Sequence, residues 1–458
     1  MATVFVIGAG PAGLFAAQKI AQAGHETIIF NRDIKPGGLA EYGIYPVKDK
    51  MKVGLRKQFD RVLSLPNVHY FGHVPVGANS PITVEALRSL CPSALVFAVG
   101  AQGTKKLGMP GEDALGVYSA KDFVYYYNQL PPFAGMDFST GKRVAIVGMG
   151  NVMVDIARWL LLDSPSRDVE EVIVVARRGP LEAKFDDKEF AHIHMHLDRE
   201  AFRQELARVK DRMQAVGQDI GRVPEETFVC LKKSPDEPLV KPRLTFRFLC
   251  SPCAITTGQD GRIEKLTLAE NYLLKRDDSI ACKTTGETTN IDVDTLIFAI
   301  GDSHDPSLGI PFASGYYSCN PDETTPHAKY QLFDPHTASV CDGCFLVGWA
   351  RKPSEGLVGI ARHDGETGAA HVLDYLSKKN ADAGLQTRRS ASPADIARLL
   401  EQRGVRAVTK TDLPFLRAAE EQEAKRRGIP FFKFSDDEEM LAAIEEAKAT
   451  GVVTVAGT

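Results

Sequence analysis

The start of the chain holds the feature that most constrains the fold. A short apolar run, Val4–Ile7, leads into Gly8, Gly10 and Gly13, and an alanine-rich segment follows. This order predicts a strand, a glycine-rich turn and a helix, which together form the fingerprint of a dinucleotide site. Gly8 permits the tight turn, Gly10 lets a pyrophosphate approach the backbone, and Gly13 lets the helix pack closely on the strand. The N–H groups of the first helical turn would then face the phosphates.

Composition narrows the class of protein. A chain of 458 residues is long enough for two or three domains with sizeable cores. With 55 basic and 59 acidic residues, the net charge of −4 argues against general nucleic-acid binding. No apolar run approaches the roughly 20 residues of a membrane span, and the signal-peptide pattern is missing. We therefore expect a cytoplasmic protein whose eight cysteines are thiols.

A second predicted strand, Glu26–Phe30, ends at the place where a dinucleotide site usually has an acidic residue to hold the ribose. Asn31 occupies this place and can hydrogen-bond a ribose hydroxyl without charge assistance. The glycine-rich loop that follows, Pro36–Pro46, is either a surface loop or backbone that lies against a flat ring.

A second fingerprint begins at Arg143. The strand pattern Arg143–Val147 meets Gly148 and Gly150 and then a helix pattern, although the third glycine is missing. The next predicted strand ends in Arg177 and Arg178. Two guanidinium groups at this place are well positioned to bind a ribose 2′-phosphate. A solvated basic pair is the alternative, and the position after a dinucleotide turn favours NADP.

Two such units about 140 residues apart predict an α/β fold with two dinucleotides. Further strands are expected at Ala94–Gly100, Asp294–Gly301 and Gly343–Trp349. Beyond a polar segment at about 378–391, helices are expected at Pro393–Gln402, Phe415–Arg427 and Asp436–Thr450.

Further motifs follow in an order that is more specific than any one of them. They include Gly111–Asp113, Gly116–Ala120, Gly150–Val152 with Asp155–Arg158, Arg177–Leu181 with Lys188–Glu189, and Gly348–Trp349 with Gly356–Val358. On these motifs, nearly the whole chain resembles the adrenodoxin-reductase-like ferredoxin–NADP reductases.

The resemblance implies two Rossmann-like dinucleotide-binding domains, with the NADP domain inserted into the FAD domain. The FAD domain would comprise residues 1–106 and 301–458, including a C-terminal helical extension from about 392 to 458. The NADP domain would comprise residues 107–300.

The resemblance also assigns residues to the two cofactors. With the first fingerprint, the FAD set is Gly8, Gly10, Ala12, Gly13, Asn31, Gly38, Leu39, Val74, Trp349, Gly356, Leu357 and Val358. The NADP set is Gly150, Asn151, Val152, Arg177, Arg178, Glu189 and Gly356. The family has an acidic residue at the place of Asn31, and it often has Asp-His where this chain has Val47-Lys48. A proton relay at that place is therefore not expected.

The implied function is electron transfer from NADPH, through FAD, to a one-electron carrier such as ferredoxin or flavodoxin, in a reaction that can be reversible. Hydride would pass to the flavin N5, so the cofactors carry the chemistry. We assign no acid or base residue, and Trp349 is the candidate ring near flavin and nicotinamide. Two alternatives stay open: a diaphorase-like input subunit similar to the glutamate-synthase small subunit, and a non-catalytic NADPH sensor.

Two cysteine pairs and a histidine run allow other chemistry. The pairs Cys250/Cys253 and Cys341/Cys344 could bind a metal or form a redox disulfide, but no further ligand flanks them, so thiols are favoured. His192, His194 and His196 would share a face on a strand, yet a polar surface segment is the commoner case. We predict no metal. A basic docking face for an acidic ferredoxin is expected, with candidates Arg199, Arg203, Arg208, Lys210 and Arg212.

Overall fold

The computed structural model describes residues 1–166, 168–233, 239–277, 279–322, 324–325, 327–353, 358–382 and 390–451. The chain divides into two compact units. Unit 1 comprises Met1–Thr104, Tyr127–Gly135 and Gly301–Thr458, and unit 2 comprises Lys105–Tyr126 and Met136–Ile300. The short segment 127–135, inside the stretch predicted for the inserted domain, packs with unit 1.

Unit 1 contains an eight-stranded sheet with the order β15-β16-β17-β4-β1-β2-β3-β18. Its five central strands, from β17 to β3, are parallel. Along the chain this is the order 3-2-1-4-5 of a Rossmann sheet, which changes direction between β1 and β4. The strands are β1 (Thr3–Ile7), β2 (Glu26–Phe30), β3 (Val68–Gly72), β4 (Ala94–Phe97), β15 (Ser318–Cys319), β16 (Gln331–Asp334), β17 (Ser339–Leu346) and β18 (Val408–Thr409).

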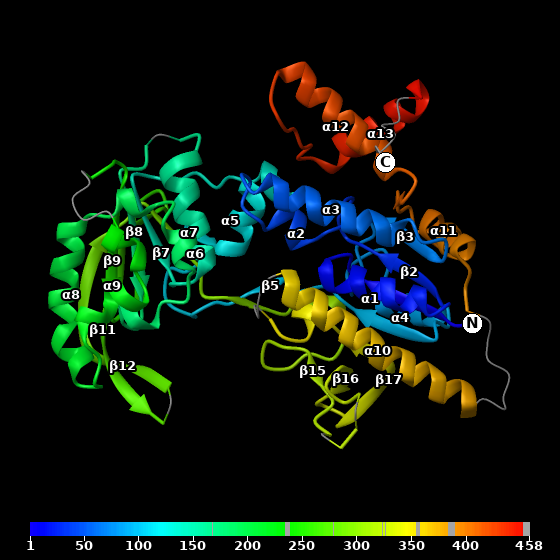
Figure 1. Ribbon diagram of the computed structural model, residues 1–458, viewed down its shortest axis with the longest axis horizontal. Helices are drawn as coiled ribbons and strands as arrows, with labels where there is room; N and C mark the ends of the chain where they lie inside the picture. Colours follow the sequence, from blue (N-terminus) through cyan, green and yellow to red (C-terminus); the bar gives the residue numbers. More distant parts are fainter. Residues whose placement is uncertain are drawn as a thin grey trace. The chain divides into compact units, whose positions relative to one another are not determined.

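Helices cover both faces of this sheet. They are α1 (Pro11–Gln22), α2 (Leu39–Tyr42), α3 (Asp49–Leu63), α4 (Val84–Ser89), α10 (Val358–Asp382), α11 (Pro393–Gln402), α12 (Leu413–Arg427) and α13 (Asp437–Thr450). In Figure 1, α10 lies beside α1, and α12 and α13 form a C-terminal hairpin. A two-stranded ribbon, β5 (Gly103–Thr104) with β14 (Asp302–Ser303), completes unit 1.

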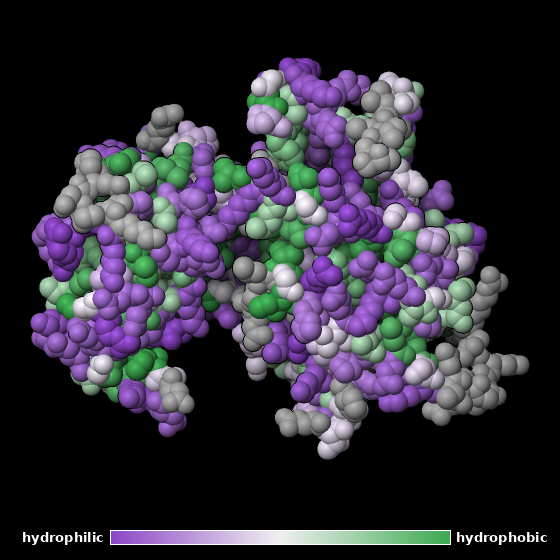
Figure 2. Space-filling view, viewed as in Figure 1, coloured by the Kyte–Doolittle hydropathy of each residue, from purple (hydrophilic) through white to green (hydrophobic). Residues whose placement is uncertain are grey.

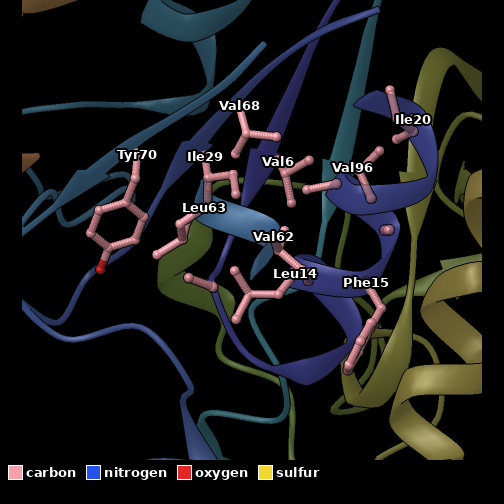
Figure 3. Packing of buried hydrophobic residues seen from close by; sticks show 14 of the residues in the cluster. Val6, Leu14, Phe15, Ile20, Ile29, Val62, Leu63, Val68, Tyr70 and Val96 are labelled. Carbon is pink, nitrogen blue, oxygen red and sulfur yellow. The ribbon is translucent and has the colours of Figure 1, made fainter. Parts of the chain in front are cut away.

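Successive side chains of β1 alternate between two hydrophobic cores, one on each face of the sheet in unit 1. Val4 and Val6 point to the face covered by α1 and α3, whereas Phe5 and Ile7 point to the opposite face. Figure 3 shows the first core, in which strand residues meet α1 and α3; it labels Val6, Ile29, Val68, Val96, Leu14, Ile20, Val62 and Leu63. A near-continuous apolar strand is what a parallel sheet buried on both faces requires.

Unit 2 repeats the parallel arrangement in a five-stranded sheet with the order β6-β13-β7-β8-β9. Its strands are β6 (Val117–Ser119), β7 (Arg143–Val147), β8 (Glu171–Ala176), β9 (Arg243–Phe248) and β13 (Thr295–Phe298). An antiparallel sheet adds β10 (Cys250–Thr257), β11 (Ile263–Arg276) and β12 (Ser279–Asp292). The helices are α5 (Ala120–Tyr127, which ends at the unit boundary), α6 (Asn151–Arg158), α7 (Asp187–Phe190), α8 (Arg199–Gln214) and α9 (Val223–Glu226).

The two Rossmann-like units confirm the predicted fold class. The predicted bounds of α11 are those observed, because a capping box at Ser392 fixes its start. The polar, linker-like segment expected at about 378–391 is helical up to Asp382, where α10 ends, and residues 383–389 lie outside the described residues. None of the helices in the described part of the chain combines the length and hydropathy that crossing a bilayer requires.

Two glycines of α10 give a matched test of the packing between α1 and α10. A Cβ atom at Gly365 would lie 2.2 Å from the carbonyl oxygen of Ala12, whereas one at Gly359 would meet no atom of the described residues within 4 Å. We predict that Gly365→Ala lowers the free energy of unfolding by about 1–3 kcal/mol, because backbone must move. Gly359→Ala should leave it unchanged or raise it by up to about 1 kcal/mol. Chemical unfolding followed by circular dichroism measures both, and equal effects would contradict the packing.

Candidate functional site

The turn after β1 forms a cradle in unit 1. Gly8 has φ +106°, and its Cβ would lie 2.5 Å from the carbonyl oxygen of Ala98. A Cβ at Gly13 would lie 2.1 Å from the oxygen of Gly8. Both glycines are therefore required by the approach of α1 to the strands.

Gly10 differs from these two glycines, because among the described residues no atom lies within 4 Å of its Cβ position. Gly10 caps α1 without a side-chain hydrogen bond to the helix, so the N–H groups of the first turn have no partner within the helix. Open space beside free helical N–H groups fits the pyrophosphate of a dinucleotide.

Two further predicted FAD residues, Gly38 and Leu39, and two residues that were not predicted, Gly37 and Gly348, lie at this cradle. The Cβ position of Gly38 lies 3.2 Å from the Cα of Gly10, and the amide of Gly37 donates to the carbonyl of Ala9 at 2.7 Å. Leu39 begins α2 directly after Gly38. The Cβ position of Gly348 lies 2.6 Å from the Cβ of Ala12. The cradle is thus built by residues 8–13, 37–39 and 348.

Asn31 uses its side chain inside the protein. It is buried, and its Oδ1 accepts a hydrogen bond from the amide of Ala9 at 2.9 Å. Its Nδ2 donates to the carbonyls of Asp33 and Lys35 at 2.8 and 3.0 Å and to the Tyr70 hydroxyl at 3.2 Å. With both donor hydrogens committed, Asn31 ties the glycine-rich turn to the segment after β2. Its backbone oxygen also accepts from Val74, whose side chain lies in the core.

Trp349 lies at the end of β17, in the short 3-10 helix η8 (Gly348–Ala350), and is half-buried. Its carbonyl accepts a hydrogen bond from Nε2 of His304 at 2.8 Å, while Nδ1 of His304 accepts from the amide of Tyr317 at 2.7 Å. Burial lowers the pKa of His304, so the ring is neutral and its Nε2 carries the hydrogen. His304, which sequence reasoning missed, therefore positions the backbone of Trp349.

Two other predicted FAD residues, Gly356 and Leu357, lie outside the described residues. Val358, also predicted, begins α10 and packs against the core that contains α1.

A cluster of buried charges holds α2 from the side of the C-terminal hairpin. Arg56 makes two 2.7 Å bonds to the carboxylate of Glu41, and Nζ of Lys433 lies 2.9 Å from the same carboxylate. Lys433 also lies over the ring of Tyr42, with Nζ 4.5 Å from its centre. Nearby, Lys35 pairs with Glu420 of α12. These contacts join the glycine-rich loop to residues almost 400 positions later.

The pKa of Glu41 is shifted by these buried charges. Burial opposes ionisation, but Lys433 and Arg56 outweigh it and hold the pKa well below its usual range. Burial lowers the pKa of Lys433 against the attraction of Glu41. The glycine-rich loop, for which a surface position was one alternative, is thus anchored inside the protein.

In unit 2, the second fingerprint forms a turn of the same kind. Gly148 has φ +128°, and its Cβ would lie 2.2 Å from the oxygen of Ala299. Gly150 caps α6 and, like Gly10, has an open Cβ position among the described residues. Asn151 accepts from the amide of Asp186 at 2.7 Å, which ties the turn to the segment before α7. Val152 is exposed at the first turn of α6.

Arg177 and Arg178 follow β8 directly. Arg177 is exposed and Arg178 is half-buried. Within the described part of the chain, neither guanidinium group has a hydrogen-bond or ion-pair partner; only the backbone carbonyls of the two residues accept hydrogen bonds. Two unpaired guanidinium groups beside a helix N-terminus suit an anion. Glu189, also predicted for this site, lies half-buried in α7.

The structure gives less support to the expected docking face on α8. Arg203 pairs with Glu200, Arg208 with Glu205 and Glu270, and Arg212 with Glu270, each at 2.7 Å. Arg199 is half-buried, and Lys210 is exposed. The surface over α8 is strongly hydrophilic in Figure 2, but acidic partners neutralise most of its positive charge.

The histidine run is not a strand. His192 lies in a turn, and His194 to His196 form a short 3-10 helix. Nδ1 of His194 bonds to the carbonyl of Ala191, and Nδ1 of His196 to that of Pro242, each at 2.7 Å. In the described ranges, no three His, Cys, Asp or Glu side chains are grouped to hold a metal ion.

The chain is similar to known proteins over nearly its whole length. A family model described as pyridine nucleotide-disulphide oxidoreductase matches residues 2–307. The chain is 28% identical to the NADPH-ferredoxin reductase FprA of Mycobacterium leprae (strain TN), over 96% of this chain and 97% of that protein. It is also 28% identical to the mitochondrial NADPH:adrenodoxin oxidoreductase of Salvelinus fontinalis, over 96% of this chain and 90% of that protein.

Among solved structures, that of Mycobacterium tuberculosis FprA in complex with NADPH matches with a TM-score of 0.80 and 26% identity. The match covers 97% of this chain and 99% of that chain. The family resemblance inferred from the motifs is confirmed.

The two open glycines allow the cradles to be tested separately. We predict that Gly10→Ala leaves the stability of the flavin-free protein unchanged but weakens FAD binding at least tenfold, because the added methyl group fills the space meant for the pyrophosphate. Gly150→Ala should leave flavin content unchanged and raise the KM for NADPH. Each variant is the other's control, measured by flavin titration and steady-state kinetics. An effect of Gly10→Ala on stability alone would contradict the cradle.

The buried cluster makes stability depend on pH. A carboxylate whose folded pKa lies below its unfolded pKa stabilises the fold above the unfolded value and loses that contribution as the pH falls. We therefore predict that unfolding becomes easier below about pH 4.5, and that this dependence is smaller in Glu41→Gln. At neutral pH, Glu41→Gln should cost about 3–5 kcal/mol, since Lys433 loses its partner. Glu200→Gln, in an exposed pair, should be close to neutral, and similar losses in both variants would refute the role of the cluster.

Proposed function

The chain belongs to the pyridine nucleotide-disulphide oxidoreductase family, and we propose that it is an FAD-dependent reductase that passes electrons from NADPH to an iron–sulfur protein such as a ferredoxin. The oxidoreductase class predicted from the sequence is confirmed by the family. Relatives of similar length are named for ferredoxin and adrenodoxin as acceptors. A flavodoxin is a further acceptor that this proposal includes.

Unit 1 has the features that FAD needs. The open position at Gly10 and the N–H groups of the first turn of α1, which have no partner within the helix, would accept the pyrophosphate, while Gly38 and Leu39 border the same cradle. The side chain of Asn31 keeps the turn in place, and Asn31 remains a proposed FAD neighbour. Trp349 lies in η8, and the hydrogen bond from His304 to its carbonyl holds its backbone. Gly356, Leu357 and Val358 remain proposed FAD neighbours.

The observation that carries the choice of NADPH is a pair of guanidinium groups in unit 2 that have no partner among the described residues. Arg177 and Arg178 follow the second strand of the fingerprint, where the ribose of a bound dinucleotide lies. NADPH carries a 2′-phosphate there, whereas NADH has a neutral hydroxyl group. Gly150, Asn151 and Val152 would receive the pyrophosphate at the start of α6, and Glu189 completes the proposed set.

When bound, the two cofactors would supply the redox chemistry, which is hydride transfer between nicotinamide and flavin and release of single electrons. The chain's own residues bind and orient the two dinucleotides. No acid or base is assigned, because Val47 and Lys48 occupy the place where the family often has Asp-His. Val47 is exposed and Lys48 is half-buried. We place the reaction in a reducing compartment such as the cytoplasm, because all eight cysteines are free thiols.

A visible spectrum of the purified protein tests the proposal first. Flavin bands that bleach on anaerobic addition of NADPH, and less readily with NADH, support the reductase. A colourless protein that binds NADP but takes up no FAD would overturn it in favour of a sensor. Reduction of ferredoxin and of flavodoxin is then assayed in parallel; failure with both, while ferricyanide is reduced, would favour a diaphorase-like subunit.

Cofactor preference gives a sharper test of the arginines. We predict that Arg177→Ala and Arg178→Ala each raise the KM for NADPH about tenfold or more, because a charge-assisted phosphate contact contributes about 1.5–3 kcal/mol. The KM for NADH should change little. Arg203→Ala, which removes an arginine already paired with Glu200, is the matched control. Equal effects on NADPH and NADH would exclude the 2′-phosphate assignment.

A further inference from the structure

The pair Cys341 and Cys344 lies at an irregular place in β17. Phe345 pairs with Gln331 of β16, and Val340 pairs with Phe333. Four residues, 341–344, therefore lie opposite Leu332 alone. Because Gln331 and Phe333 are two residues apart, the ends of the looped-out segment are only roughly 7 Å apart.

This loop-out brings the two cysteines together. Gly343, with φ +67°, provides the left-handed residue that the bend requires. Cys341 and Cys344 lie just inside the narrow ends of the segment, and disulfides join Cα atoms about 4.4–6.8 Å apart. In a regular strand, residues three apart would lie roughly 10 Å apart on opposite faces.

The guanidinium group of Arg88 interacts with both thiols. Arg88 of α4 donates to Sγ of Cys344 at 3.1 Å. Burial raises the pKa of Cys344 and of Cys341, and Arg88 acts in the opposite direction on each. Arg88 thus offsets part of the rise that burial causes, although the pKa of both thiols stays above its ordinary value.

Side chains of α10 hold residues 341–344 in place, and one of the two sulfur atoms is more exposed than the other. Asp342 accepts hydrogen bonds from the Tyr375 hydroxyl at 2.7 Å and from Nζ of Lys379 at 3.1 Å, both on α10. Cys341 is half-buried, whereas Cys344 is 2% exposed. The first cysteine is thus open to a small reagent, and the second can only react within the protein.

We propose that Cys341 and Cys344 form a reversible disulfide by exchange with a low-molecular-weight disulfide of the glutathione class. The thiolate of Cys341 attacks one sulfur of the reagent and releases one thiol, which leaves a mixed disulfide on Cys341. The thiol of Cys344 then loses its proton, attacks the Cys341 sulfur and releases the second thiol. The two cysteines are oxidised by two electrons, and the reagent disulfide is reduced to two thiols.

The other pair in the chain, Cys250 and Cys253, is a built-in control. Sγ of Cys253 donates to the carbonyl of Thr267 at 3.4 Å, whereas Sγ of Cys250 bonds to Phe248 and Glu270. β10 has only a one-residue irregularity there, so the pair is not folded back on itself. These partners on β11 are three residues, roughly 10 Å, apart. We expect this pair to stay reduced.

Trypsin places each pair on its own peptide, residues 330–351 and residues 248–262. The holoprotein is equilibrated with graded ratios of reduced to oxidised glutathione, alkylated and digested, and the peptides are weighed. The expected result is that peptide 330–351 becomes two hydrogen atoms lighter and resists alkylation, while peptide 248–262 carries two alkyl groups throughout. Full alkylation of both peptides, or oxidation of both at the same ratio, would overturn the proposal.

Three variants test the order of events. Cys344→Ser should stop at the mixed disulfide with glutathione on Cys341, whereas Cys341→Ser should leave Cys344 unmodified. Arg88→Gln should slow oxidation at neutral pH about fivefold, with the rate recovering as the pH rises, because the thiolate loses its cation. A mixed disulfide on Cys344 in Cys341→Ser, or an unchanged rate and pH profile in Arg88→Gln, would count against the mechanism.

Discussion

The close backbone approach at the start of α1 is the contact on which unit 1 depends. Gly13 leaves no room for a side chain against Gly8, and Gly8 leaves none against Ala98. Ala12 is enclosed by Gly348 from the end of β17 and by Gly365 from α10. Because the helix can come this close, its N-terminus lies where the sheet changes direction, and among the described residues no atom fills the space beside Gly10 at its first turn. The cofactor cradle is therefore a result of backbone packing.

Both units contain a glycine-rich turn between a strand and a helix, but the residues that follow the next strand differ. In unit 1 the residue after β2, Asn31, turns inward and ties the glycine-rich turn to its neighbours. In unit 2 the residues after β8, Arg177 and Arg178, keep their side chains unpaired within the described residues. Gly13 of the first turn corresponds by position to Met153 of the second, which is fully buried. The same fold thus supports a proposed site built from backbone in one unit and a proposed anion site built from arginines in the other.

Distant parts of unit 1 are coupled to the cradle through two connections. Glu41, Arg56 and Lys433 join the loop beside Gly38 to the C-terminal segment. Strand β17 connects the cysteine pair to η8, where Gly348 meets Ala12 and donates its amide hydrogen to Asp364 at 2.5 Å. A change at residues 341–344 therefore occurs in the strand that positions Gly348 and Trp349.

The sequence by itself determined the fold class, both fingerprints and the arginine pair, because these depend on residues close together in the chain and on the periods of strand and helix. The start of α11 was equally local. The roles of Asn31, His304 and Lys433 were decided by the tertiary structure, since their partners lie far away or on backbone atoms that no pattern reveals. The arginines of α8 predict a basic face, but Glu270, about 60 residues later, pairs with two of them, Arg208 and Arg212. A pattern records which side chains a segment carries, but the charge that remains and the space that stays open depend on what the fold places beside them.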